Sequence, residues 1–183
     1  MIKRDKEDSV GIKEVRDTLK KKKGVSSKLN YLSGFLDQNT LSKSAEKEVH
    51  EMYAKILIED LPKYWGIGTD DIINIEQHLK KAGRLDKLAE LYEKHKEYSN
   101  AGSTWRKVGN YDRAGKNFLL AGREIEREGV MGGADKDYAL AGDSYKKAGS
   151  LKMAKKMYDK AHSIASEEDE RAQFGWHPLI QGK

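Results

Sequence analysis

The chain has 183 residues, of which 37% are hydrophobic and 36% charged, and its formal net charge is +5. This length suits one domain with a sizeable buried core. Because the sequence contains no cysteine, disulfides, thiolate nucleophiles and cysteine-based metal sites are excluded.

Composition also limits the possible fold class and cellular location. Only two prolines occur, and abundant Lys and Glu favour helices over short strands. No stretch approaches the roughly 18 consecutive apolar residues that a membrane-spanning helix needs, and residues 1–15 lack the apolar stretch of a secretion signal. We therefore expect an all-α, cytoplasmic protein without membrane insertion.

The positive charge is concentrated at the amino terminus. Residues 1–30 contain ten Lys/Arg and five Asp/Glu, whereas residues 31–183 contain 25 of each. Ile12, Val15 and Leu19 form one apolar stripe of a helix, which we expect to end at Gly24 after a run of lysines. The run is interpreted as a solvated helix end, favoured by the macrodipole. The alternative is a basic arm, residues 3–28, that contacts nucleic acid or anionic lipid.

Two further helices are predicted before residue 62. Ser26 or Ser27 is expected to cap a helix that carries Leu29, Leu32, Phe35 and Leu36. A second helix, near residues 44–61, places Ala45, Val49, Met52, Ile56 and Leu57 on one side and stops near Pro62. The stretch GIGTDD at 66–71 has no strand before it, so it predicts a loop and a helix start at Thr69 rather than a phosphate site.

From Ile72 onward the predicted helices come in pairs. Each pair breaks at a glycine suited to a left-handed helix stop, namely Gly83, Gly109 or Gly149. The predicted pairs are 72–82 with 85–96, 98–108 with 111–128, and 134–148 with 151–165.

Small and aromatic residues recur within these pairs. Ala101 and Gly102 lack bulk, so a neighbouring helix is expected to approach closely there, between the larger Tyr98 and Trp105. The returning helix presents Ala114, Phe118 and Ala121 on one stripe. The next copy repeats the pattern with Tyr138, Ala141, Gly142 and Tyr145, followed by Ala154, Tyr158 and Ala161. One hairpin cannot cover its own apolar faces, so the copies are expected to stack.

These residues resemble the tetratricopeptide (TPR) repeat, whose pattern is W-x2-L-G-x2-Y followed by A-x3-F. Here Tyr98-x2-Ala101-Gly102-x2-Trp105 precedes Ala114-x3-Phe118, and Tyr138-x2-Ala141-Gly142-x2-Tyr145 precedes Ala154-x3-Tyr158. A weaker copy contains Ile72, Ile75, Leu79, Gly83, Leu85, Leu88 and Tyr92, with Glu76 in place of the small glycine.

The chain also departs from that pattern. Successive copies are 26 and then 40 residues apart, rather than the usual ~34, and the repeat-ending proline is absent. Its long helices and its recurring Ala-Gly pairs also resemble those of the soluble attachment proteins of vesicle fusion. The resemblance covers about residues 72–165 and implies antiparallel helix hairpins stacked as a short TPR-like α-solenoid.

No catalytic or metal-binding motif was found. The five histidines, at 50, 78, 95, 162 and 177, form neither a His-x3-His pair nor a HExxH motif, and each is expected on a helix surface. The acidic run SEEDE at 166–170 lacks the glycine and alternating ligands of a calcium loop, so a solvated helix end is expected. We therefore expect no enzyme activity and no cofactor.

Three regions are expected: a helical region with the basic arm at 1–65, repeats at 66–165, and a capping helix end with an apolar tail at 166–183. The tail contains Phe174, Trp176, Leu179 and Ile180, and is expected to fold back over the last repeat. The alternative is a docking peptide.

The resemblance implies a protein-binding adaptor or scaffold with a curved groove for a peptide or helix. Nucleic-acid association through the basic arm is the alternative, and an oligomerising structural unit is a third possibility. The first helix of each pair would line the groove and end in two cations. This predicts a row of positive charges along the groove that binds an acidic or carboxylate-ended segment of a partner. The predicted groove residues are Asn74, Gln77, Lys80, Lys81, Asn100, Ser103, Arg106, Lys107, Asp143, Lys146 and Lys147.

Overall fold

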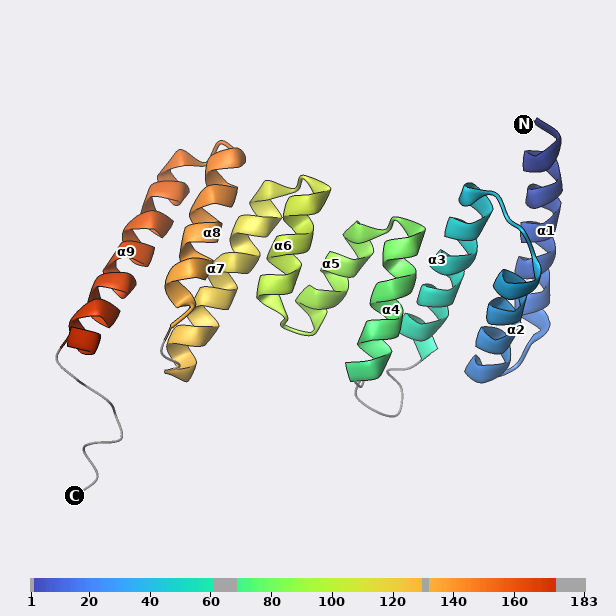
Figure 1. The fold of residues 1–183 in the computed structure, drawn as a ribbon, viewed down its shortest axis with the longest axis horizontal. Helices are drawn as coiled ribbons and strands as arrows, with labels where there is room; N and C mark the ends of the chain where they lie inside the picture. The colour runs from blue at the N-terminus through green and yellow to red at the C-terminus, as the bar shows by residue number, and fades with distance from the viewer. Residues whose placement is uncertain (1, 61–68, 130–131, 174–183) are drawn as a thin grey trace, which may run out of the picture. The chain divides into compact units, whose positions relative to one another are not determined.

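The computed structural model describes residues 2–60, 69–129 and 132–173 of the chain (Figure 1). Within these ranges the chain forms nine helices and no strand, which confirms the all-α class. It divides into two compact units, Met1–Arg84 and Leu85–Lys183, here called unit 1 and unit 2. The boundary expected after residue 65 and the apolar tail at 174–183 lie outside the described residues.

Unit 1 has a core built on its third helix. The first and second helices both pack against α3, and α4 packs against α3 as well. Ile12 and Val15 of α1 are buried with Leu32 of α2 and Val49 of α3, as their helical spacing predicts. The helices are α1 (Ile2–Lys21), α2 (Val25–Gln38), α3 (Lys43–Asp60) and α4 (Thr69–Ala82).

The start of α2 corrects two expectations. Gly24 occupies the N-cap position of α2 with a φ of 81°, and no side chain caps that helix. Ser26 and Ser27 therefore lie inside the first turn rather than before it, and α1 ends at Lys21, before Gly24. Glycine adopts the positive φ that this tight α1–α2 connection requires, so α2 begins at Val25, directly after Gly24, without a hydroxyl cap.

Unit 2 is a run of antiparallel helices. Each helix packs against the next along the chain, from α5 to α9. Their bounds match the paired segments predicted from sequence, except that α5 stops at Lys94 and α9 continues past residue 165 to Gln173. The helices are α5 (Leu85–Lys94), α6 (Tyr98–Val108), α7 (Tyr111–Glu128), α8 (Ala134–Lys147) and α9 (Leu151–Gln173).

Two hairpin turns of unit 2 share one backbone pattern. Gly109 has a φ of 86° and its N–H donates to the carbonyl of Arg106, while the N–H of Asn110 donates to Trp105. Gly149, at a φ of 80°, and Ser150 repeat both hydrogen bonds after α8. This is the glycine-terminated helix stop that the sequence predicted.

The α6–α7 hairpin also repeats its side-chain packing in α8–α9. A Cβ atom placed on Gly102 would lie 3.0 Å from the ring of Phe118, and one on Gly142 would lie 2.6 Å from the ring of Tyr158. Both contacts join positions sixteen residues apart, and the second pair follows the first by forty residues. The close helix approach expected at Gly102 and Gly142 is therefore confirmed.

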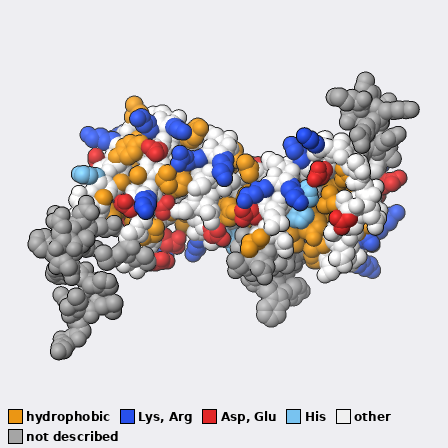
Figure 2. Space-filling view, viewed as in Figure 1, with side chains coloured by type: hydrophobic (Ala, Val, Ile, Leu, Met, Phe, Trp, Pro, Cys, Tyr) orange, Lys and Arg blue, Asp and Glu red, His pale blue; other side chains and the backbone are white. Residues whose placement is uncertain are grey.

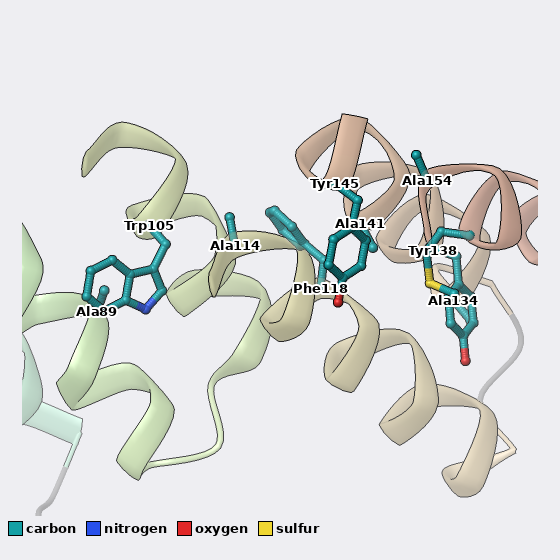
Figure 3. Close-up of a cluster of buried hydrophobic side chains, with 10 residues drawn as sticks. Ala89, Trp105, Ala114, Phe118, Ala134, Tyr138, Ala141, Tyr145 and Ala154 are labelled. Atoms are coloured by element: carbon teal, nitrogen blue, oxygen red, sulfur yellow. The ribbon is translucent and has the colours of Figure 1, made fainter. Parts of the chain in front are cut away.

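Glycines also set the distance between the two hairpins. A Cβ on Gly115 of α7 would lie 3.0 Å from the Tyr145 ring, and one on Gly122 would lie 3.0 Å from the Tyr138 ring. Figure 3 shows Phe118 and Tyr145 side by side within the cluster of buried side chains, and Tyr138 further along the same cluster. Aromatic rings of one hairpin thus lie against bare backbone of the other, which makes one continuous core across the two.

Candidate functional sites

The predicted groove residues of unit 1 all lie on α4. Asn74, Gln77, Lys80 and Lys81 are exposed. Lys80 forms an ion pair with Glu76, one turn before it on the same helix. Lys81 instead lines a hollow of unit 1 that also contains two histidines. The four residues therefore do not form one uniform surface.

In unit 2 the predicted residues lie on α6 and α8. Asn100, Ser103 and Lys107 on α6, and Asp143, Lys146 and Lys147 on α8, are exposed, and Arg106 is half-buried. Two of them form side-chain hydrogen bonds within the unit. The Asn100 side chain donates to Glu97 at 2.8 Å, and Asp143 accepts from the Tyr158 hydroxyl at 2.8 Å.

The carboxyl ends of α6 and α8 lie at the same end of unit 2 (Figure 1). Both helices run antiparallel to α7, so the α6–α7 and α8–α9 turns lie at the same end in Figure 1. The ammonium of Lys147 lies 5.3 Å from the centre of the Tyr111 ring, which links the end of α8 to the start of α7. We call the residues Arg106, Lys107, Lys146 and Lys147 the cationic edge.

Exposed apolar side chains occur beside the cationic edge. Val108 is 41% exposed and directly follows Lys107, while Leu151 is 66% exposed at the start of α9. Figure 2 shows blue and orange side chains mixed over the upper part of unit 2. A surface with both cations and apolar groups suits an amphipathic or acidic partner segment better than a purely hydrophobic one.

The opposite end of unit 2 is acidic. The amino ends of α6 and α8 meet there, and the Ser99 hydroxyl donates to both carboxylate oxygens of Asp137, at 2.8 and 3.0 Å. Burial raises the pKa of Asp137, and the Ser99 hydrogen bond only partly offsets this effect. Glu97, Glu124 and Glu128 line the adjacent shallow hollow.

A polar network ties α5, α6 and α7 together. Glu93 accepts hydrogen bonds from the Trp105 indole N–H at 2.8 Å and from the Asn117 side chain at 2.6 Å, and it pairs with Arg113. The Arg113 guanidinium lies 3.9 Å from the centre of the Trp105 ring. Partial burial opposes the charged form of Glu93, but hydrogen bonds from Asn117, Arg113 and Trp105 outweigh it and lower its pKa. These internal contacts fix the position of Trp105 between α5 and α7.

A histidine pair in unit 1 was not foreseen. The Nδ1 atoms of His50 on α3 and His78 on α4 lie 2.8 Å apart. The ring of Tyr53 stacks on His78, with ring centres 3.8 Å apart and planes at 4°. The Nε2 atom of His50 lies 3.7 Å from Glu46. A hollow of about 470 Å³ opens beside the pair and is also lined by α2 residues and Lys81.

The surroundings of the pair favour neutral imidazoles. Burial, then the neighbouring His50 and Lys81, lower the pKa of His78 to about 4. Burial and Lys81 also lower the pKa of His50, against the opposing effect of Glu46. At neutral pH one ring therefore donates its Nδ1 proton and the other accepts it.

The pair corrects the expectation that every histidine lies on a helix surface. His50 is only 4% exposed, His78 and His95 are half-buried, and only His162 is exposed among the four histidines that the structure describes. The two partners are 28 residues apart on different helices, so no local spacing rule finds them. His50 directly follows the buried Val49 of α3 and His78 directly precedes the buried Leu79 of α4, so knowledge that α3 packs against α4 would have suggested the pair.

Two kinds of feature are absent from the described part of the chain. No described helix has the length and apolar character to cross a membrane. No group of three or more His, Asp or Glu side chains in the same part is arranged to hold a metal ion. No protein-family model, curated protein or solved structure matches the chain.

Proposed function

We propose that the chain is a TPR-like protein-binding module whose unit 2 takes an acidic segment of another protein at the cationic edge. The observation that carries the proposal is the repeated hairpin, in which Gly102 with Phe118 and Gly142 with Tyr158 make equivalent contacts. Repeated helix hairpins characteristically present extended surfaces to peptides or helices. The buried side chains Thr104, Asn117, Asp137 and Ser144 of unit 2 each make an internal hydrogen bond, although the Asn117 Oδ1 and His95 Nε2 atoms have no described partner. This internal use of buried polar groups favours an adaptor role over catalysis.

Electrostatics support the choice of the cationic edge. Lys107, Lys146 and Lys147 are exposed, and no ion pair is described for them or for Arg106 in the part of the chain that the structure covers. Lys80 and Lys81 are left out of this edge, because they belong to unit 1 and because Lys80 is already paired. Desolvating an unpaired surface cation against a carboxylate costs less than first breaking an internal pair.

The test is a binding titration with two charge-reversed variants. The partner is first identified by affinity capture and mass spectrometry, and its acidic segment is then titrated at low and physiological salt. Arg106→Glu with Lys147→Glu should weaken binding several-fold, each exposed pair contributing about 0.2 to 1 kcal/mol. Lys155→Glu with Lys156→Glu on α9 is the matched control, since it makes the same change in net charge at exposed positions elsewhere. Equal affinities for both double variants would exclude the cationic edge.

Nucleic-acid association through the basic arm remains a second candidate, because Lys13, Lys21 and Lys23 are exposed. Part of the arm's charge is satisfied internally, since Arg16 pairs with Glu48 and Lys20 with Asp17. Duplex DNA contacts would make log K fall with log salt by about 0.9 per phosphate contacted. A shallow slope, unchanged by Lys21→Gln with Lys23→Gln, would reject this candidate.

A further inference from the structure

The histidine pair of unit 1 lies outside the cationic edge and plays no part in the proposed protein binding. It consists of two imidazoles whose Nδ1 atoms are 2.8 Å apart and an adjoining hollow of about 470 Å³. Core packing alone does not account for two polar rings aimed at each other beside an open space, since apolar residues would fill the same positions more favourably.

Neighbouring side chains fix the orientation of both imidazole rings. Tyr53 stacks flat on His78 and fixes the plane of that ring. Glu46, one turn before His50, faces the Nε2 atom of His50 at 3.7 Å, and so favours the tautomer that carries its proton on Nε2. The Nδ1 lone pair of His50 then points at His78. This is the arrangement in which a carboxylate orients a metal-binding histidine through its second nitrogen.

We propose that the Nδ1 atoms of His50 and His78 together bind one late first-row divalent cation, with Cu²⁺ or Ni²⁺ preferred over Zn²⁺. Imidazole nitrogens suit these metals, and Cu²⁺ and Ni²⁺ favour square or tetragonal coordination. Two nitrogens at adjacent corners of such a square, each about 2.0 Å from the metal, lie about 2.8 Å apart, whereas tetrahedral Zn²⁺ needs about 3.3 Å. The observed separation is 2.8 Å.

Binding replaces a shared proton with a metal. Each neutral histidine carries one ring proton, so with both Nδ1 atoms on the cation both protons lie on Nε2. The proton of the Nδ1–H···Nδ1 bond therefore moves to the other nitrogen of its ring, and no proton is released at neutral pH. The hollow beside the pair would give water access to the remaining coordination positions.

Nearby charges set the strength of the site. Lys81 on α4 opposes a cation, whereas Glu46 on α3 and Asp37 on α2 favour one, and all three line the hollow. With only two protein ligands, this site is weaker than a closed structural metal site. The affinity should be constant from about pH 7 to 8 and fall in acid, where protons compete for both nitrogens.

The experiment titrates the full chain with Ni²⁺, Cu²⁺ and Zn²⁺ separately by calorimetry. The variants are His50→Gln, His78→Gln and Glu46→Gln, and His162→Gln, exposed on α9, is the control. One equivalent of Ni²⁺ or Cu²⁺ should bind more tightly than Zn²⁺. Either variant of the pair should lose at least about tenfold in affinity, Glu46→Gln should lose about tenfold, and His162→Gln should match the wild type.

A second measurement on the wild type covers the case in which a histidine variant does not fold. Ring-nitrogen NMR should show the Nδ1 signals of His50 and His78 broadened first by sub-stoichiometric Ni²⁺, ahead of His162. Unchanged affinity in a folded His78→Gln variant, the absence of binding, or broadening of other histidines first would each overturn the site and leave the pair as a plain hydrogen bond.

Discussion

Tyr158 occupies the space that a side chain at Gly142 would need: a Cβ atom there would lie 2.6 Å from Cε1 of the tyrosine ring. Real Cβ atoms essentially never approach a carbon so closely, so only glycine allows α8 and α9 to pack at this distance. The equivalent pair in the preceding hairpin, Gly102 and Phe118, is slightly less tight at 3.0 Å. The ring of Tyr158 is additionally held by the hydrogen bond from its hydroxyl to Asp143.

Replacement of Gly142 should therefore destabilise unit 2. Gly142→Leu is expected to cost on the order of 1 to 3 kcal/mol, and Gly102→Leu a similar or smaller amount. Gly34→Leu on α2 is the control, because a Cβ at that glycine meets nothing within 4 Å, and better helix propensity should stabilise it by up to about 1 kcal/mol. Urea denaturation measures all three. Equal urea midpoints for Gly142→Leu and Gly34→Leu would show that Gly142 has no packing role.

Glu93 should matter far more than its neighbour Glu90. Glu93→Gln removes the charge that pairs with Arg113 and weakens the acceptor for Trp105 and Asn117, so a loss of about 1 to 3 kcal/mol is expected. Glu90 lies 3.7 Å from Arg113 and is exposed, so Glu90→Gln should cost at most about 0.5 kcal/mol. The two substitutions are chemically identical and one helical turn apart, and chemical denaturation at pH 7 compares them directly.

The histidine pair predicts loss of stability in mild acid. The pKa of His78 is about 4 when folded, against 6.5 unfolded, so the unfolded chain binds the proton more readily between these values. The free energy of unfolding should fall as the pH drops from about 6.5 to 4, by on the order of 2 to 3 kcal/mol for this residue. His78→Gln should flatten that part of the profile. Glu93, whose pKa is lowered on folding, contributes a separate loss below about pH 4.5.

The Ser99 hydroxyl should stabilise the buried charge of Asp137. Ser99→Ala removes both hydrogen bonds to that carboxylate, so the pKa of Asp137 should rise further and stability at pH 7 should fall by about 1 to 2 kcal/mol. Ser103→Ala, exposed one turn later on α6, should leave both quantities unchanged. NMR titration of the Asp137 carboxyl group and thermal unfolding give the two readouts. An unshifted pKa in Ser99→Ala would show that the hydroxyl has no electrostatic role.

Local signals accounted for most of the helix pattern. Glycines with positive φ ended α6 and α8 where the sequence placed them, because no other residue adopts that conformation at low cost. The connection from α5 to α6 was harder to place, since Lys96 takes the left-handed conformation there with a φ of 60°. No glycine marks that turn, and the predicted helix end at residue 96 was accordingly too late.

Contacts between helices were predictable only where one helix repeated another. The approach at Gly102 and Gly142 followed from the repeat, whereas the contacts of Glu93 with Arg113 and Asn117 join separate helices and have no sequence signature. The same limitation hid the histidine pair, because its chemistry depends on how α3 and α4 pack. Most candidate groove residues lie on exposed surfaces, whereas the ion pair of Lys80 with Glu76 was not foreseen.

The parallel directions of α6 and α8 give the cationic edge a second role. A helix carries roughly half a negative elementary charge at its carboxyl end and half a positive one at its amino end, and this edge holds the carboxyl ends of α6 and α8 beside the amino ends of α7 and α9 (Figure 1). Arg106, Lys107, Lys146 and Lys147 lie in those last turns and mask the backbone charge. Neutral glutamines at the four positions would remove the cations and leave helix ends of both signs at this edge, so the surface would lose its attraction for carboxylates without coming to repel them.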